Sequence, residues 1–515
     1  MKRFHSYGKT LQLRYQFIHL NGVLQNRYRF DRFHFNISNH GKNNKMTYSS
    51  KTKEVDEELK YLLDELLKRK KKRESIVTLH QRRLRLDNSN HLETSSSTSK
   101  TIYKIASDFC HLYLSQSPLS TKSLENDNSR LKILMDILRK CNTDESRINS
   151  LIEKYQKNPK SSKLIGEIRD ACTPSYESLF QFILSEADWK LGMKFMVEIR
   201  SDLFYYKQLL KESSSNDLWL QCQQIDHNLK QMLTIWFSSC LLELRRITYH
   251  QSSASIIETI AKKEAVHPLQ SLQDLRNRFG PSKRCYALFH PSLPDEPLVF
   301  VHVALLSHIP DSMTQIKESQ LSENTASTAC FYSITSTQKG LSGIDLGNQL
   351  IKRVVQTLSN ELTSIQTYST LSPIPRFRKW LEENQDKILT LDEKERLSLL
   401  FQSSYPPDDT FKSLLMRLAA YYLLSEKHRG MPIDPVAKFH IRNGAEIYRL
   451  NWLADDSRKG LHNSFGIMVN YRYCLNDIET NHFLFESQGQ IKAKSGILNW
   501  LYPHPHSHSK SKSNL

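Results

Sequence analysis

The chain has 515 residues, a formal net charge of +18 and 39% hydrophobic residues. A chain of this length can bury a large core and is expected to divide into two or three domains. It contains no run of 18 apolar residues, so we expect no transmembrane helix and no membrane insertion.

Most of the positive charge lies near the start of the chain. Residues 1–100 hold 22 Lys and Arg against 10 Asp and Glu, a net +12, which leaves only +6 for residues 101–515. There is no zinc-finger spacing and no aromatic strand of the kind that binds RNA, so we expect no nucleic-acid partner. The eight cysteines form no CxxC pair, which predicts reduced thiols and no metal site.

Residues 1–45 carry nine Lys and Arg against one Asp, with apolar residues interleaved among them. An acid-poor, Arg-containing amphipathic start is typical of a mitochondrial transit peptide, and a basic disordered arm is the alternative. We therefore expect a location in the mitochondrial matrix. Initiation at Met46 would instead give a form in the cytosol or in peroxisomes.

Residues 46–100 are expected to form a charged helix and a linker. The segment 53–74, KEVDEELKYLLDELLKRKKKRE, places its leucines on one stripe, with acidic residues early and basic residues late. This order suits the helix dipole. Residues 86–100, which end in SSSTSK, have the composition of a linker.

Residues 101–190 are predicted to form an all-helical domain, and the helical pattern itself continues to about residue 250. Glycine and proline are rare there, and RLKILMDILRKC and HNLKQMLTIWFSSCLLELRRI both have helical periodicity. The periodicity therefore predicts helix through the end of the second segment.

Residues 191–505 are predicted to form a mixed α/β catalytic domain. Short segments rich in β-branched and aromatic residues alternate there with helical ones. The expected strands lie at residues 297–306, 329–337, 368–371, 445–452 and 466–475. The fold class is therefore α+β, with a helical domain followed by a mixed domain.

The segment ACFYSITSTQKGLSGIDLGNQLIKRVV predicts a strand, a glycine loop and a helix. The strand ends near Thr337, Gly340 and Gly343 lie in the loop, and the helix begins around Asp345. Glycines allow close approach of a ligand, and a helix start attracts phosphate. The nearest pattern is the acyl-CoA-binding loop of GNAT acetyltransferases, with Leu341 at the first glycine position. The same arrangement also occurs as plain scaffold.

A histidine lies in the predicted short helix PVAKFHIRNG. Asp434 is a suitable N-cap, Pro435 suits the first helical position, and Asn443 with Gly444 ends the helix. His440 falls in the last turn, where a protonated imidazole is favoured and can hold or deliver a proton. The alternative is a buried histidine bonded to backbone.

The C-terminal segment HPHPHSHSKSKSNL has the composition of a disordered tail, and residues 506–515 are assigned to it. Its last three residues, Ser513, Asn514 and Leu515, resemble the peroxisomal Ser-Lys-Leu signal with asparagine in the middle. We expect the histidines of this tail to bind nothing specific.

Several long motifs occur in one order and together resemble the malonyl-CoA decarboxylase family. The motifs are GMKFMVEIRSDL, KQMLTIWFSSCLLELRRITYHQ, EAVHPLQSLQDLRNRFGPSKRCY, YSTLSPIPRFRKWL, SEKHRG, PVAKFHIRNGAEIYRLNWLADDSRKG and SFGIMVNYRYCL. The resemblance spans roughly residues 192–475. It implies a helical domain that assembles homo-oligomers, a tetramer by resemblance, and a catalytic domain of GNAT-like fold.

The resemblance also implies the site residues. The catalytic serine and histidine of the family correspond to Ser372 and His440, and Arg472 and Tyr473 are further pocket candidates. The CoA-binding loop corresponds to Ser342, Gly343, Ile344, Asp345, Leu346, Gly347 and Asn348. Asp345 stands where relatives can carry glutamate.

The implied reaction converts malonyl-CoA to acetyl-CoA and CO2 through a thioester enolate. It would control the malonyl-CoA level in fatty acid metabolism. The substrate supplies its own electron sink, so no cofactor is expected. The protein must supply hydrogen-bond donors to the enolate and one proton to carbon. The alternative is a GNAT-type acyltransferase that moves an acyl group from CoA to an amine.

Overall fold

The structure is a computed structural model that describes residues 53–70 and 96–501. Short gaps within that range are 120–127, 142, 144, 173–174, 213–215, 270, 322 and 403–405. The expected transit segment, Met46, residues 86–95 of the predicted linker and the tail lie outside the described residues. The linker prediction is wrong for residues 96–100, which begin helix α3 (Ser96–Ser115). The elements below lie in one compact unit, Val55–Leu515.

The charged helix predicted at residues 53–74 is present over residues 53–70. Its leucine stripe is buried, with Leu59, Leu63 and Leu66 fully covered. Acidic residues on its exposed side bind lysines of the next helical layer, as Asp64 Oδ1 does with Lys140 Nζ at 2.7 Å. The amphipathic pattern therefore anchors this helix to the helical domain.

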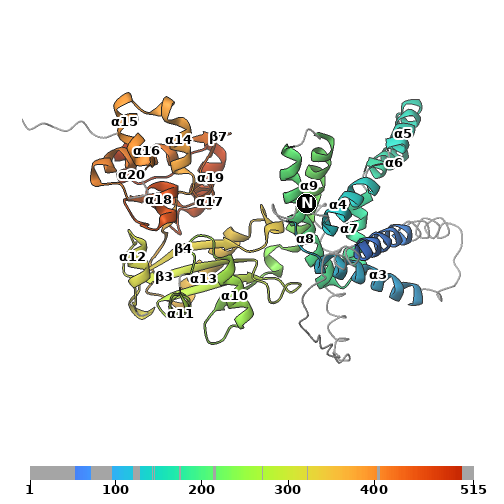
Figure 1. Cartoon of the computed structure of the whole chain (residues 1–515), viewed down its shortest axis with the longest axis horizontal. Coiled ribbons are helices and arrows are strands. Elements are labelled where there is room, and N and C mark those ends of the chain that lie inside the picture. Colours follow the sequence, from blue (N-terminus) through green and yellow to red (C-terminus); the bar gives the residue numbers. More distant parts are fainter. Residues whose placement is uncertain are drawn as a thin grey trace, which may run out of the picture. The chain divides into compact units, whose positions relative to one another are not determined.

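The N-terminal part of the described chain is built from helices (Figure 1). They are α3 (Ser96–Ser115), α4 (Ser129–Lys140), α5 (Glu145–Lys157), α6 (Ser162–Cys172), α7 (Ser175–Glu186), α8 (Trp189–Glu212) and α9 (Asn216–Trp236). A buried charge cluster joins three of them, because the Arg130 guanidinium lies 3.1 Å from Asp202, which also accepts a 2.8 Å hydrogen bond from Tyr113.

The helix predicted through residue 247 is wrong beyond Trp236. A 3-10 turn, η1 (Ser239–Leu241), follows α9, and strand β1 (Glu243–Ile247) pairs antiparallel with β2 (Lys283–Phe289). Pairing with a strand some 40 residues later overrides the local helical pattern. Helices also continue past residue 190, where the helical domain was expected to end; that boundary stays a prediction.

The second half contains a sheet ordered β1-β2-β3-β4-β5-β10-β6, with β9 beside β10. The further strands are β3 (Val299–Leu306), β4 (Thr328–Ser336), β5 (Thr367–Thr370), β6 (Ser372–Pro373), β9 (Glu446–Asn451) and β10 (Met468–Tyr473). Strands β1 to β4 are antiparallel, and β5 runs parallel to β4 after the helix that connects them. All five predicted strands are confirmed, whereas β2 was not predicted.

Helices cover both faces of the central strands, which explains why β2 and β3 are buried along their whole length. On one face, isoleucines of α10 (Ala254–Lys263) pack with residues of β2 such as Ala287, next to α11 (Leu272–Arg278). On the other face, α13 (Leu346–Glu361) contributes Leu350 and Val354. Figure 1 shows these helices beside β3 and β4.

The C-terminal helices are orange to red in Figure 1, and several of them contribute rings to an aromatic core. They are α14 (Phe377–Ile388), α15 (Leu391–Gln402), α16 (Lys412–Leu424), α17 (Pro435–Arg442), α18 (Arg458–Ser464), α19 (Ile478–Gln488) and α20 (Ser495–Leu501). The rings of Trp380 and Tyr422 lie 4.9 Å apart in this core. The predicted order of a helical domain followed by a mixed domain is confirmed. Within the described ranges, no helix has both the length and the apolarity needed to cross a bilayer.

Candidate active site

The glycine loop joins β4 to α13 as predicted. It contains a 3-10 turn, η3 (Lys339–Leu341), and Gly343 in the left-handed region at φ 79°. Asp345 is the N-cap residue of α13, but its side chain makes no hydrogen bond to the first-turn amides. Its carboxylate accepts instead from the side-chain Nδ2–H of Asn348 at 2.9 Å. The helix start therefore keeps the uncapped amides and positive dipole end that favour an anion.

Helix α17 has the predicted caps. The Asp434 carboxylate accepts from the amides of Val436 and Ala437 at 3.0 and 2.8 Å, and Gly444 follows the helix at φ 82°. His440 lies in the last turn and is only 3% exposed. The short helix therefore places the His440 imidazole in the interior of the domain.

Ser372 lies opposite this histidine in the short strand β6, where it pairs with Val469 of β10. Its Oγ is 3.3 Å from His440 Nε2 and donates to Thr370 Oγ1 at 2.9 Å. The side chain is buried at 5% exposure. Strand pairing and the following proline fix the backbone, so the hydroxyl is held toward the imidazole.

The other ring nitrogen of His440 is also bonded. Its Nδ1 lies 2.7 Å from Tyr473 Oη, and its ring stacks on Tyr471 at 4.6 Å between centroids. Loss of solvation lowers the pKa of His440 to about 3, so the imidazole is neutral. The protonated state expected from its place in the last turn is wrong, because full burial outweighs the helix dipole.

The hydrogen bonds favour one tautomer of this neutral ring. Burial raises the pKa of Tyr473, which keeps its phenol protonated and able to donate to Nδ1. The proton of His440 then lies on Nε2, which faces Ser372, and the Ser372 hydroxyl donates onward to Thr370. A single chain of donors thus runs from Tyr473 through His440 to Ser372.

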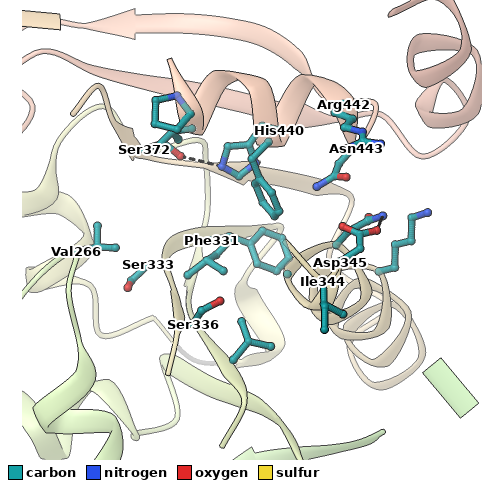
Figure 2. A pocket seen from close by; sticks show the side chains of 18 of the residues that line it. Val266, Phe331, Ser333, Ser336, Ile344, Asp345, Ser372, His440, Arg442 and Asn443 are labelled. Atoms are coloured by element: carbon teal, nitrogen blue, oxygen red, sulfur yellow. Dashed lines mark hydrogen bonds between the residues drawn. The ribbon is translucent and has the colours of Figure 1, made fainter. Parts of the chain in front are cut away.

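Ser372 and His440 open onto a cavity of about 880 Å³ that the glycine loop lines from another side. Figure 2 shows their hydrogen bond above the space, with Ile344 and Asp345 at the start of α13. Of the seven predicted loop residues, five line the cavity: Gly343, Ile344, Asp345, Gly347 and Asn348. The cavity therefore brings an acid–base pair and an anion-binding helix start together.

Four predicted residues lie outside the cavity lining. The Ser342 carbonyl accepts from Arg200 at 3.0 Å, and Leu346 is buried in the core. Arg472 pairs with Glu446 at 2.5 Å, whereas Tyr473 acts on the site only through His440. Arg472 and Tyr473 differ in this way because neighbouring residues of a strand, here β10, point to opposite faces of the sheet.

Sequence reasoning missed several cavity residues. Ser333 of β4 lines the wall, and its hydroxyl lies 2.8 Å from both carboxylate oxygens of the buried Glu264. A polar residue inside the apolar strand ACFYSITST was the available signal. Lys230, Lys352 and Arg442 bring positive charge to the same cavity. Lys230 comes from α9 of the helical domain, and no local pattern connects it with the loop.

Comparison with known proteins finds matches to one family over most of the chain. Residues 142–237 match the model of the malonyl-CoA decarboxylase N-terminal domain, and residues 240–511 match that of the C-terminal domain. The chain is 36% identical over 420 residues to the mitochondrial malonyl-CoA decarboxylase of Anser anser anser, covering 74% of this chain and 81% of the relative. It is 38% identical over 365 residues to the mitochondrial enzyme of Mus musculus, covering 64% and 72%.

Solved structures have the same fold. The crystal structure of malonyl-CoA decarboxylase from Rhodopseudomonas palustris superposes with a TM-score of 0.67 at 33% identity, covering 78% of this chain and 97% of that one. The enzyme from Agrobacterium vitis gives 0.66 at 30% identity, with coverage of 78% and 98%.

Proposed function

This chain belongs to the malonyl-CoA decarboxylase family, and we propose that Ser372 and His440 perform the chemistry of the family in the cavity described above. The enzyme converts malonyl-CoA to acetyl-CoA and CO2. The observation that carries the proposed site is the buried Ser372–His440 hydrogen bond on a cavity that also contains the glycine loop.

The reaction breaks the bond between the α-carbon and the carboxylate of the malonyl group. CO2 leaves, and the bonding electron pair moves onto the thioester as an enolate. One proton must then be added to the α-carbon. The protein lowers the barrier by placing hydrogen-bond donors where negative charge develops and by positioning that proton. The Ser372 hydroxyl, which donates to Thr370 in the free enzyme, would turn to donate to the enolate oxygen, with the Nε2–H of His440 beside it.

Bound substrate changes the charge state of His440. The malonyl carboxylate brings a negative charge into the buried site, and an opposite charge favours the protonated imidazole, against the lowering of its pKa by burial. The Ser372–His440 pair then gives its proton to the α-carbon and regains one from water. The reaction consumes one proton in total, and the pair ends unchanged.

The glycine loop would hold the CoA part of the substrate. The first-turn amides of α13 and the cavity-lining Gly343, Gly347 and Asn348 lie where a diphosphate can approach backbone. A Cβ at Gly347 would lie 3.0 Å from the Phe439 ring, so a side chain at this position of the helix start would collide with that ring.

An assay without acceptor separates this reaction from acyl transfer. The purified chain is incubated with malonyl-CoA and no amine, and release of CO2 and formation of acetyl-CoA are measured. A decarboxylase turns over under these conditions, whereas an acyltransferase requires an acceptor. Absence of CO2 release would remove the decarboxylase reaction.

The same assay tests the site. We predict that Ser372→Ala and His440→Ala each lower kcat at least about a hundredfold, the low end for a positioned acid–base group. CoA affinity should change far less. Ser398→Ala and His462→Ala, which alter exposed side chains outside the cavity, are the matched controls. Near-normal turnover in a folded site variant would refute its assigned role.

We also propose a homo-tetramer in the mitochondrial matrix, where the enzyme would control the malonyl-CoA level in fatty acid metabolism. The names of the avian and rodent relatives support the mitochondrial location. The residues before 46 would act as the transit segment. Sedimentation of the purified enzyme measures the oligomer, and a mass equal to one chain would contradict the proposal.

A further inference from the structure

We propose that Lys230 of helix α9 binds a phosphate group of CoA, so that the helical domain completes the substrate site. This inference rests on the proposed function, because it assumes that the cavity holds CoA. It assigns a binding role to a residue outside the glycine loop.

Lys230 lies directly beside the loop. It lines the cavity, and its Nζ and Cε would be 3.3 and 3.4 Å from a Cβ at Gly343. Gly343 has a φ of 79° and lies three residues before the start of α13. The lysine ammonium therefore reaches the position where the uncapped helix start also favours negative charge.

Lys230 has no ion-pair partner in the part of the chain that the structure describes. Among the described residues, no carboxylate lies within 4.0 Å of its Nζ. Asp226, four residues earlier on α9, would be its natural partner, but it pairs instead with Arg200 at 2.8 Å and Lys207 at 2.9 Å. Two cations therefore bind the carboxylate that lies one turn before Lys230, and Lys230 keeps its charge for a ligand.

The Arg200 ion pair also fixes the position of Lys230 relative to the loop. Arg200 is buried, and its guanidinium donates to the carbonyls of Gly340 at 2.5 Å and Ser342 at 3.0 Å. Helix α8 touches the loop so closely that a Cβ at Gly340 would overlap the Val197 carbonyl oxygen. The loop carbonyls are thus bound to the helical domain.

Other charged side chains of both signs also line the cavity. Lys352 adds a cation from α13, and Arg442 adds another that is shared with Glu486 at 2.9 Å. Asp345 and Glu479 bring negative charge to the same lining. Of these groups, Lys230 is the cation whose Nζ lies 3.3 Å from the position of a Cβ at Gly343, so it is the one positioned for a phosphate at the start of α13.

Two parts of CoA have the required chemistry, the diphosphate and the 3′-phosphate. We would measure KM and kcat with malonyl-CoA, malonyl-dephospho-CoA and malonyl-pantetheine for the unmodified enzyme, Lys230→Ala and Lys230→Arg. Lys211→Ala is the matched control, since Lys211 is an exposed lysine of α8 that does not line the cavity. Calorimetric titration with CoA measures binding without turnover.

We expect Lys230→Ala to raise KM for malonyl-CoA about tenfold with kcat nearly unchanged, the signature of lost uniform binding. Lys230→Arg should recover most of the affinity, and Lys211→Ala should have no effect. If Lys230→Ala does not raise the KM for malonyl-dephospho-CoA, the group bound by Lys230 is the 3′-phosphate. A penalty that persists there but disappears with malonyl-pantetheine identifies the diphosphate.

An unchanged KM for malonyl-CoA and unchanged CoA binding in Lys230→Ala would overturn the proposal. A penalty of equal size on all three substrates would also overturn it, because malonyl-pantetheine has no diphosphate and no nucleotide. Failure of the unmodified enzyme to release CO2 would be a different result, and would contradict the proposed function instead.

Discussion

At the residue scale, the site is defined by what surrounds His440. Tyr473 bonds one ring nitrogen, Ser372 lies against the other, and Tyr471 stacks on the ring. Burial makes the free ring neutral, so its charge depends on what enters the cavity. Under the proposed mechanism, the anionic substrate itself would favour the proton that catalysis needs.

The first prediction concerns stability and pH. The pKa of His440 is about 3 when folded and about 6.5 when unfolded, so between these values the unfolded chain binds more protons. Stability is thus lost as pH falls from 6.5. Replacing His440 by Gln should remove up to about 2 kcal/mol of the stability difference between pH 7 and pH 5. Urea unfolding at both pH values measures it.

The exposed His462 provides the control for this experiment. His462→Gln should keep the full pH dependence of the unfolding free energy. If His440→Gln and His462→Gln have the same dependence, His440 is not neutral in the folded enzyme.

The second prediction tests the tautomer. Tyr473→Phe removes the donor to His440 Nδ1 while retaining the ring, so we expect kcat to fall about tenfold or more with KM little changed. Tyr471→Phe is the matched control, because the Tyr471 hydroxyl has no hydrogen-bond partner among the described residues. Equal activity of the two variants would show that the Tyr473 hydroxyl does not orient the ring.

Sequence patterns located these residues only in part. The caps around Asp434 and Gly444 predicted the helix that carries His440, and the family resemblance supplied Ser372. The neutral state of His440 was not predictable, because it results from burial by residues distant in sequence, such as Tyr471.

At the element scale, the strand, glycine loop and helix that end at α13 were predicted because their signals are local. The strand end near Thr337, the two loop glycines and the helix start around Asp345 all lie within one segment. Strands β1 and β2 were missed for the opposite reason. Each is stabilised by a partner that is distant in the chain, and β1 also has helical periodicity.

The third prediction concerns the loop. Gly343→Asp should weaken CoA binding at least about tenfold, because it places a side chain and a negative charge at the helix start and strains a backbone at φ 79°. Gly343→Ala separates strain from charge, and calorimetric titration with CoA measures both variants. Gly166→Ala is the control, since a Cβ there meets nothing within 4 Å. Unchanged affinity in Gly343→Asp would place the phosphates elsewhere.

At the scale of the whole molecule, the cavity is assembled from segments that are far apart in the chain. It includes Lys230 from the helical domain, Ser333 from β4 and His440 from α17. Family motifs identified several of these segments but not their spatial relation. Contacts such as the one between Arg200 and the loop depend on the docking of two domains, which local patterns do not encode.

A further prediction concerns location. Full-length protein should enter mitochondria, because residues 1–45 are basic and nearly free of acid. A form that starts at Met46 should remain outside them, in the cytosol or, if Ser513–Leu515 is recognised, in peroxisomes. Imaging requires an internal tag, since tags at either end mask the signals. Full-length protein that stays out of mitochondria would refute the transit segment, and an evenly cytosolic Met46 form would refute the peroxisomal signal.

If the loop binds CoA as proposed, the bonds from Arg200 to the Gly340 and Ser342 carbonyls would couple the helical domain to that binding. Any coupling between two events in one molecule is reciprocal. If CoA binding orders the loop, it also strengthens the docking of α8 and α9, and saturating CoA then protects these helices from hydrogen exchange and heat. By the same reciprocity, a change that strengthens the docking of α8 and α9 would raise the affinity for CoA by the factor by which CoA strengthens that docking.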